Sequence, residues 1–189
     1  MKTLKNLSLL FISALVFIAC SSDDDNPEAV NEEEVITTLT ATLIPAGDGS
    51  TITLQTQDLD GDGPNDPVIT VSGVLAANTI YSGTLELLNE TESPAESINA
   101  EIEEEDEDHQ FFFQVSNDLA TFTYEDEDEN GNPVGLEFTV TTGDTTGTGT
   151  LTITLRHEPS KSGTGVSDGD ITNAGGETDI QAIFSISVE

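Results

Sequence analysis

The chain has 189 residues, with 4 Lys+Arg against 37 Asp+Glu, and a formal net charge of −33. A surface this acidic repels phosphate, which excludes nucleic-acid binding and charge-driven adsorption to anionic membranes. The single cysteine excludes an internal disulfide and a cysteine-based zinc site, and the two histidines leave little material for a hydrolytic triad. We therefore expect one folded domain without enzymatic activity.

The beginning of the chain, residues 1–19, has the pattern of a secretory signal peptide. Lys2 and Lys5 supply positive charge ahead of an apolar stretch, residues 7–18, that is too short to span a bilayer. The only cysteine, Cys20, stands at the expected cleavage site. We predict that cleavage leaves Cys20 as the mature N-terminus, with acyl chains that anchor the protein in a membrane. An ordinary signal peptide that happens to contain a cysteine is the alternative.

Residues 20–34 are strongly acidic and contain almost nothing to bury. Such a segment repels itself and cannot form a core, so we predict an acidic disordered tether after the lipidated cysteine. Its first six residues, Cys-Ser-Ser-Asp-Asp-Asp, resemble the signal that directs lipoproteins of the Bacteroidota to the outer face of the outer membrane. A plain solvated spacer is the alternative.

From Val35 to the C-terminus, apolar and polar residues alternate with a period of two. Nine runs carry this alternation, at 35–43, 52–54, 69–71, 81–87, 111–115, 120–124, 136–140, 151–155 and 180–188. Clusters of Gly, Asp, Asn and Pro separate the runs, and Thr is abundant at the alternate positions. The pattern predicts that residues 35–189 form an all-β domain, a single antiparallel β-sandwich of the Ig-like or Greek-key type.

One segment departs from this period. Residues 93–96, Ser-Pro-Ala-Glu, match a capping box with proline at the first helical position. Ile98 and Ile102 follow four residues apart, which places them on one helical face. We predict one short peripheral helix over residues 94–107, lying across an end of the sandwich.

Two acidic turns have the spacing of calcium-binding loops. The candidate ligands of the first turn are Asp58, Asp60, Asp62 and Asp66. Those of the second, which follows the pattern D-x-D-x-N-G-x₅-E, are Asp126, Asp128, Asn130 and Glu137. Oxygen ligands at this spacing surround a hard cation, so Ca²⁺ is the predicted cofactor. Strands rather than helices flank both segments, and ordinary acidic β-turns are the alternative.

The two histidines follow different patterns. His109 ends a run of acids, and His157 continues the apolar face of the strand at 151–155. A joint site with neighbouring carboxylates could hold zinc, copper or iron, and those carboxylates would be Glu107, Asp108 and Glu158. Because nothing in the sequence brings the histidines together, we favour the simpler interpretation. In it, His157 caps the edge of the core with a backbone hydrogen bond and His109 is exposed to solvent.

Over its whole length the chain resembles small flavobacterial-type lipoproteins of the outer membrane. The resemblance rests on Cys-Ser-Ser-Asp-Asp-Asp at 20–25, Asp-Leu-Asp-Gly-Asp-Gly-Pro at 58–64, His-Gln-Phe-Phe-Phe at 109–113, Leu-Arg-His-Glu-Pro at 155–159 and Asp-Ile-Thr-Asn-Ala-Gly-Gly-Glu-Thr-Asp-Ile at 170–180. Members are often labelled type 1 periplasmic binding fold superfamily proteins, which implies a role in outer-membrane uptake. The label also implies alternating strands and helices, whereas the pattern here predicts strands almost throughout.

Two functions of different classes follow. The first is a lipid-anchored envelope protein that binds a cation or a small ligand and serves an outer-membrane transporter. The alternative is a structural or adhesion-type surface lipoprotein whose acidic loops are made rigid by calcium.

Overall fold

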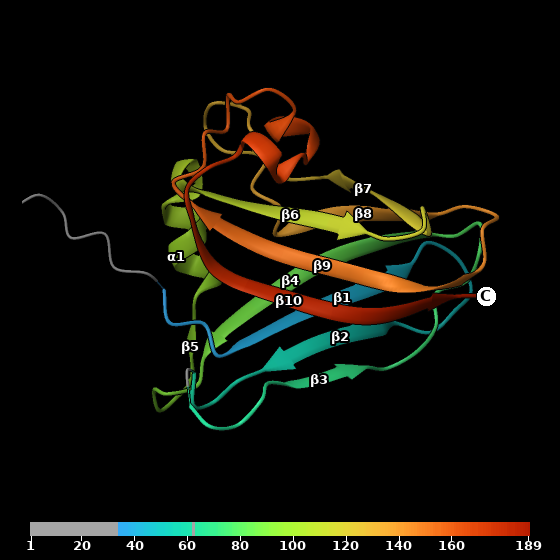
Figure 1. The fold of residues 1–189 in the computed structure, drawn as a ribbon, viewed down its shortest axis with the longest axis horizontal. Coiled ribbons are helices and arrows are strands. Elements are labelled where there is room, and N and C mark those ends of the chain that lie inside the picture. Colours follow the sequence, from blue (N-terminus) through green and yellow to red (C-terminus); the bar gives the residue numbers. More distant parts are fainter. Residues whose placement is uncertain (1–33, 62) are drawn as a thin grey trace, which may run out of the picture. The chain divides into compact units, whose positions relative to one another are not determined.

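The computed structural model describes residues 34–61 and 63–189. Most of these residues belong to two antiparallel sheets and the segments that connect their strands (Figure 1). Sheet A contains β1 (Thr38–Pro45), β2 (Ile52–Gln57), β3 (Val68–Val71), β4 (Ile80–Asn89), β5 (Glu96–Ser97), β7 (Ala120–Tyr124) and β8 (Glu137–Thr142). Sheet B contains β6 (His109–Val115), β9 (Gly147–His157) and β10 (Glu177–Val188). The predicted all-β sandwich is confirmed. The predicted signal peptide, Cys20 and nearly all of the predicted tether lie outside the described residues.

The strand order of sheet A is β3-β2-β1-β4-β8-β7, with the two-residue β5 paired to β4. The first three strands form a meander, and β4 then returns to the free side of β1. This order is that of a Greek key, as predicted. Sheet B has the order β10-β9-β6, so that β9 lies between its two partners (Figure 1).

The core lies between the two sheets and follows the period of two. On β1, Leu39, Ala41 and Leu43 are 0–1% exposed, and the threonines between them face outward. On β9, Leu151, Ile153 and Leu155 are equally buried, and the next inward position is His157. The apolar face of sheet B therefore leads directly into a histidine at one end of the sandwich.

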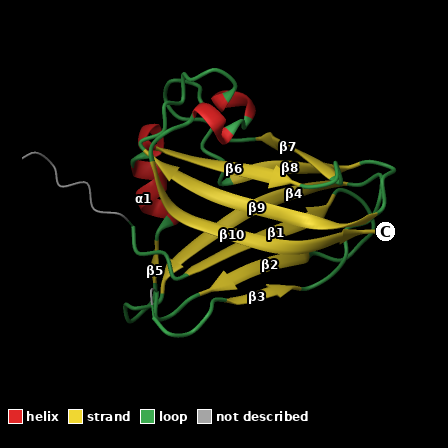
Figure 2. Cartoon of the chain, in the orientation of Figure 1, coloured by secondary structure: helices red, strands yellow, loops and turns green. Residues whose placement is uncertain are grey.

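A second, smaller cluster covers the outer face of sheet B. Phe112 points away from the main core but is 0% exposed, because Val166, Ala174 and Ile171 pack over it. These three residues belong to the segment between β9 and β10, which carries the short 3₁₀ helices η2 (Val166–Asp168) and η3 (Ile171–Asn173), drawn among the helices of Figure 2. The first four residues of β6 are therefore buried on both faces of the strand.

The edge strands β6 and β7 are joined by a side chain rather than by a ladder. The Tyr124 hydroxyl donates a hydrogen bond of 2.6 Å to the carbonyl oxygen of Phe111. Burial raises the pKa of Tyr124 to about 12, so the hydroxyl remains a donor over the whole physiological range.

The helix begins later than the sequence predicts. It is α1 (Asn99–Glu104), followed by the 3₁₀ turn η1 (Asp106–Asp108). The capping box at 93–96 is wrong as a helix start, because Glu96 and Ser97 pair with the end of β4 instead. The Asn99 side chain accepts a hydrogen bond from the Leu87 amide at 2.7 Å and so fixes the helix against β4.

The predicted apolar stripe of the helix is confirmed. Ile98 and Ile102 are 3% and 0% exposed, and α1 lies at the end of the sandwich where β6 begins (Figure 1). No helix in the described part of the chain is long and apolar enough to cross a membrane. The strand–helix alternation implied by the type 1 periplasmic binding label is not found in residues 34–61 and 63–189, where strands follow one another directly.

Candidate metal site

The two histidines meet at one end of sheet B. The antiparallel pairing of β6 with β9 places His109 directly opposite His157, and the ring centroids are 4.5 Å apart. Both residues occupy inward positions, in phase with the apolar face, and their side chains are 0% and 5% exposed. The expectation that His109 is exposed to solvent is wrong, because the register of the sheet carries it into the interior.

Two carboxylates complete the cluster. Glu34, just ahead of β1, places Oε1 2.8 Å from His109 Nε2 and Oε2 3.4 Å from His157 Nδ1. Asp179, on β10, places Oδ1 3.6 Å from His157 Nδ1 and Oδ2 4.0 Å from His109 Nε2. One ligand atom from each of the four residues lies within 4.8 Å of the others. The carboxylate side chains are only 2% and 0% exposed, so the whole cluster is buried.

A β-bulge gives Asp179 its position. Thr178 pairs with Arg156 and Ile180 with Leu155, so Asp179 is the residue inserted between two steps of the ladder. In a regular strand the residue before inward-facing Ile180 would direct its side chain away from the core. The inserted residue changes this phase, as bulges do, and brings the carboxylate to the histidines.

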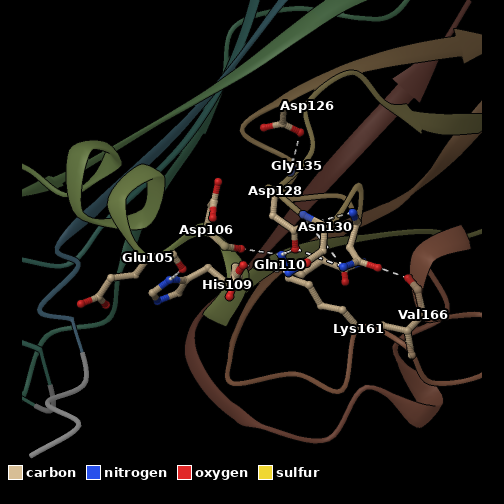
Figure 3. Close-up of polar contacts among 12 residues, drawn as sticks. Glu105, Asp106, His109, Gln110, Asp126, Asp128, Asn130, Gly135, Lys161 and Val166 are labelled. Carbon is tan, nitrogen blue, oxygen red and sulfur yellow. Dashed lines mark hydrogen bonds and ion pairs between the residues drawn. The ribbon is translucent and has the colours of Figure 1, made fainter. Parts of the chain in front are cut away.

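The end of α1 fixes the ring of His109. The Nδ1 atom lies 3.0 Å from the carbonyl oxygen of Glu105, and Figure 3 shows the imidazole beside this residue. A carbonyl oxygen only accepts hydrogen bonds, so Nδ1 carries the proton and Nε2 is the nitrogen that faces Glu34. Metal-binding histidines commonly donate their other ring N–H in this way, which orients the ligating nitrogen.

Two polar atoms of the cluster lack hydrogen bonds. Glu34 Oε2 and His157 Nδ1 are buried, and neither has a hydrogen-bond partner among the described residues. Such atoms are uncommon, because a buried polar atom without a partner loses the free energy of hydration. A cation between the two atoms would satisfy both. A divalent ion would also balance the charge of two ionised carboxylates in this buried site.

The spacing suits a small metal ion. A tetrahedral ion with bonds of about 2.0–2.2 Å separates its ligand atoms by about 3.3–3.6 Å. In the cluster, the shortest distance between two ligand atoms is 2.8 Å, and all four ligand atoms lie within 4.8 Å of one another. Small side-chain movements would therefore bring nitrogen and oxygen ligands around one ion.

The carboxylates that the sequence pairs with the histidines lie elsewhere. Glu107 Oε1 accepts a hydrogen bond of 2.8 Å from the Asn130 side chain. Asp108 and Glu158 are joined through their backbones, where the Glu158 amide donates to the Asp108 carbonyl at 2.7 Å. The structure brings the two histidines together but leaves these carboxylates outside the cluster, because adjacent residues in a strand face opposite sides.

In the second predicted calcium loop, N–H groups already occupy the carboxylate oxygens. Asp126 accepts backbone hydrogen bonds from Gly135, Leu136 and Glu137 at 2.7–3.0 Å. Asp128 Oδ1 accepts from the backbone amides of Asn130 and Asn132 at 2.9 and 2.8 Å (Figure 3). A calcium ion would have to displace these donors.

Lys161 completes the surroundings of Asp128. Its Nζ lies 3.0 Å from Asp128 Oδ2 and also donates to the Asp106 carbonyl, as the dashed lines of Figure 3 show. Burial by itself would raise the pKa of Asp128, but the Asn132 amide and the Lys161 ammonium outweigh it and lower that pKa below 3.8. The second loop is thus organised around a protein cation.

The first predicted calcium loop is exposed and locally bonded. Asp58 Oδ1 accepts from the Asp60 amide at 3.3 Å, and Asp60 Oδ2 accepts from the Asn65 side chain at 2.6 Å. Asp66 is exposed, and Asp62 lies outside the described residues. Within residues 34–61 and 63–189, the cluster of Glu34, His109, His157 and Asp179 is the only gathering of three or more His, Cys, Asp or Glu ligand atoms. Calcium binding at both loops stays a prediction.

Sequence reasoning missed Glu34 and Asp179. Glu34 stands at the end of an acidic run, where its neighbours give it no distinguishing mark. Asp179 precedes the last apolar run and belongs to the segment 170–180 on which the lipoprotein resemblance partly rests. The one available signal was the position of Asp179, a polar residue next to the start of a predicted strand. That position did not indicate a bulge.

Comparisons with family models, with curated proteins and with solved structures find no significant match for this chain. The class of the protein therefore rests on its own fold and site. It is an all-β sandwich with a buried cluster of two histidines and two carboxylates that could hold a metal ion.

Proposed function

We propose that the protein is a cell-envelope binding module whose sandwich domain holds one divalent transition-metal ion. The observation that carries the proposal is the convergence of Glu34, His109, His157 and Asp179, with ligand atoms within 4.8 Å and side chains no more than 5% exposed. Imidazole and carboxylate ligands suit zinc, iron, copper and nickel. Zinc is the first ion to test, because it accepts four nitrogen and oxygen ligands in a tetrahedron.

The burial of the cluster supports a held ion rather than a catalytic one. Catalytic zinc sites keep one position open for water or substrate, whereas closed sites use four protein ligands. All four side chains here are nearly inaccessible, so a substrate would have no approach to the ion. This arrangement favours a non-enzymatic role.

Elemental analysis of the native protein, purified without chelator, tests the proposal first. We expect one zinc, iron, copper or nickel ion per chain. Chelator-treated protein titrated with Zn²⁺ by calorimetry should then bind one equivalent. His157→Ala should lose that binding, whereas Asp126→Asn with Asp128→Asn should retain it. Equal zinc binding by His157→Ala and the wild type would refute the site.

We also propose that the protein is a lipoprotein of the outer membrane, anchored through Cys20 and serving a transporter there. The support comes from the sequence, through the signal-peptide pattern and the acidic residues after the cysteine. Cys20→Ser should release the protein from membranes or leave an uncleaved precursor. Intact mass of the mature protein with an unmodified N-terminus elsewhere would refute this assignment.

A structural role without metal is the second candidate, and one distance favours it. The 2.8 Å separation of His109 Nε2 and Glu34 Oε1 is that of a charge-assisted hydrogen bond. An imidazolium at this position would make the cluster an ionic contact between β6 and the start of β1. Absence of any transition metal from the native protein, together with no zinc binding by calorimetry, would select this alternative.

A further inference from the structure

We propose that a metal ion in the cluster fastens the segment that leads into β1, so that Glu34 acts as a metal-operated latch at the beginning of the folded domain. This inference rests on the proposed metal binding and adds a consequence of it. It concerns the regulation of the segment 34–36 rather than the identity of the ion.

The ligands come from two different places in the fold. His109, His157 and Asp179 lie on β6, β9 and β10, which are the three strands of sheet B. Glu34 belongs to the segment before β1, the first strand of sheet A. An ion bound by all four would therefore join the entry to sheet A with one end of sheet B, the end near α1 in Figure 1.

The segment 34–36 is otherwise held weakly. Regular hydrogen bonding begins at Thr37, whose amide donates to the Leu88 carbonyl at 3.0 Å and whose carbonyl accepts from the Asp58 amide at 2.7 Å. Among the described residues, the contact of the Glu34 carboxylate with His109 is the only hydrogen bond that residues 34–36 make. Val35 is 55% exposed, so packing holds this part of the chain mainly through Ile36.

The Glu34 carboxylate itself points to a cation. Its side chain is 2% exposed, and Oε2 has no hydrogen-bond partner although it lies 3.4 Å from His157 Nδ1. Without an ion, only the hydrogen bond between Glu34 Oε1 and His109 Nε2 holds the carboxylate in place within the described part of the chain. With an ion bound, both Oε1 and Oε2 of Glu34 would face a positive charge. Opening of the segment 34–36 would then require separation of the carboxylate from the metal.

Thermodynamic linkage relates the closure of the segment 34–36 to the affinity of the cluster for the metal. If the ion stabilises the closed segment by a certain factor, the closed segment must raise metal affinity by the same factor. Loss of a group that supports a metal site typically lowers affinity by about 10–100-fold. We therefore expect zinc to lower the open fraction of the segment by at least about tenfold, and Glu34→Gln to weaken zinc binding by the same factor.

Hydrogen exchange measured by mass spectrometry tests the latch on the full chain with and without Zn²⁺. The Thr37 amide, which donates to the Leu88 carbonyl, should exchange at least about tenfold more slowly with zinc, while peptides from β4 should change little. Glu34→Gln should still bind zinc through the three ligands of sheet B, but its Thr37 amide should not respond. Glu86→Gln, an exposed substitution on β4, is the matched control and should behave as the wild type.

The two proposals fail in different ways. Zinc binding by the wild type without slower exchange at the Thr37 amide would overturn the latch and leave the metal site intact. Absence of zinc binding would overturn the proposed function and the latch together. The wild-type comparison requires no variant, so the result does not depend on the folding of Glu34→Gln.

Discussion

The buried cluster and the acidic loop at 126–137 both gather carboxylates, but their surroundings are opposite. In the loop, the Asp126 and Asp128 carboxylates receive backbone N–H groups and the Lys161 ammonium. In the cluster, the Glu34 carboxylate faces imidazole nitrogens, and one of its oxygens has no hydrogen-bond donor. A high density of aspartate therefore does not by itself indicate a cation site, whereas buried acceptors without donors are groups that a bound cation would satisfy.

The carboxylates of the loop at 126–137 have donors because they form the hydrogen bonds of the turn itself. Asp, Asn and Gly in a turn use their side chains to accept neighbouring backbone amides, and the loop at 126–137 follows this rule throughout. Hydrogen bonds to a charged group each contribute about 1.5–3 kcal/mol, so a calcium ion that displaced several of them would bind weakly. The motif D-x-D-x-N-G here forms a turn whose carboxylates accept backbone amides.

We expect the largest effect on stability when Lys161, the cation of the loop at 126–137, is replaced. Lys161→Met leaves the Asp128 carboxylate buried without its partner, and removal of one member of a buried ion pair typically costs about 3–5 kcal/mol. We expect the free energy of unfolding in urea to fall by this amount. Lys161→Met with Asp128→Asn should recover part of the loss, because asparagine removes the unpaired charge and its amide oxygen can still accept hydrogen bonds from the Asn130 and Asn132 amides. A loss below about 1 kcal/mol would mean that the loop does not depend on Lys161.

The next effect tests the cluster. Asp179→Asn keeps the shape of the side chain but removes its charge. We expect zinc affinity to fall by about 100-fold or more, because even groups that only support a metal ligand contribute about 10–100-fold. Calorimetric titration measures this, with Asp128→Asn as the control that should bind zinc like the wild type. The opposite ranking of these two variants would reverse the comparison.

Acid should weaken the loop through Asp128. Its pKa is lowered in the folded protein, so the stabilisation from its ionised form is fully present above the ordinary value of 3.8 and is lost as the pH falls through the lower folded pKa. The stability difference between the wild type and Asp128→Asn should therefore be constant at neutral pH and shrink below about pH 4. Urea unfolding at several pH values measures it. A difference that stayed constant at acidic pH would show that the charge of Asp128 is unimportant.

Calcium should give the smallest effect, and mainly at the first acidic turn. Millimolar Ca²⁺ should raise the melting temperature by about 2–4 °C more than NaCl of equal ionic strength, which corresponds to about 1 kcal/mol for a domain of this size. Asp60→Asn with Asp62→Asn should remove most of the difference. Should Asp126→Asn with Asp128→Asn abolish it instead, the loop at 126–137 would be a calcium site and the comparison would fail.

The residue pattern alone was sufficient to locate most elements of the fold. The period of two located the strands and named their inward residues, as at Leu39 and Leu155, because alternation along a strand is a local property. It also found the buried stripe of Ile98 and Ile102, although it placed the helix start too early. That error arose because Glu96 and Ser97 pair with β4, a contact that no local capping pattern reveals.

The candidate site, in contrast, depends on how the strands pack together. The phase of His157 with the apolar face was visible in the sequence, but its pairing with His109 depends on the register of β6 against β9. The bulge that turns Asp179 inward and the approach of Glu34 from outside sheet B are likewise contacts between distant segments. Register and bulges are set by the packing of whole strands against one another, so residue patterns along a single strand cannot specify them.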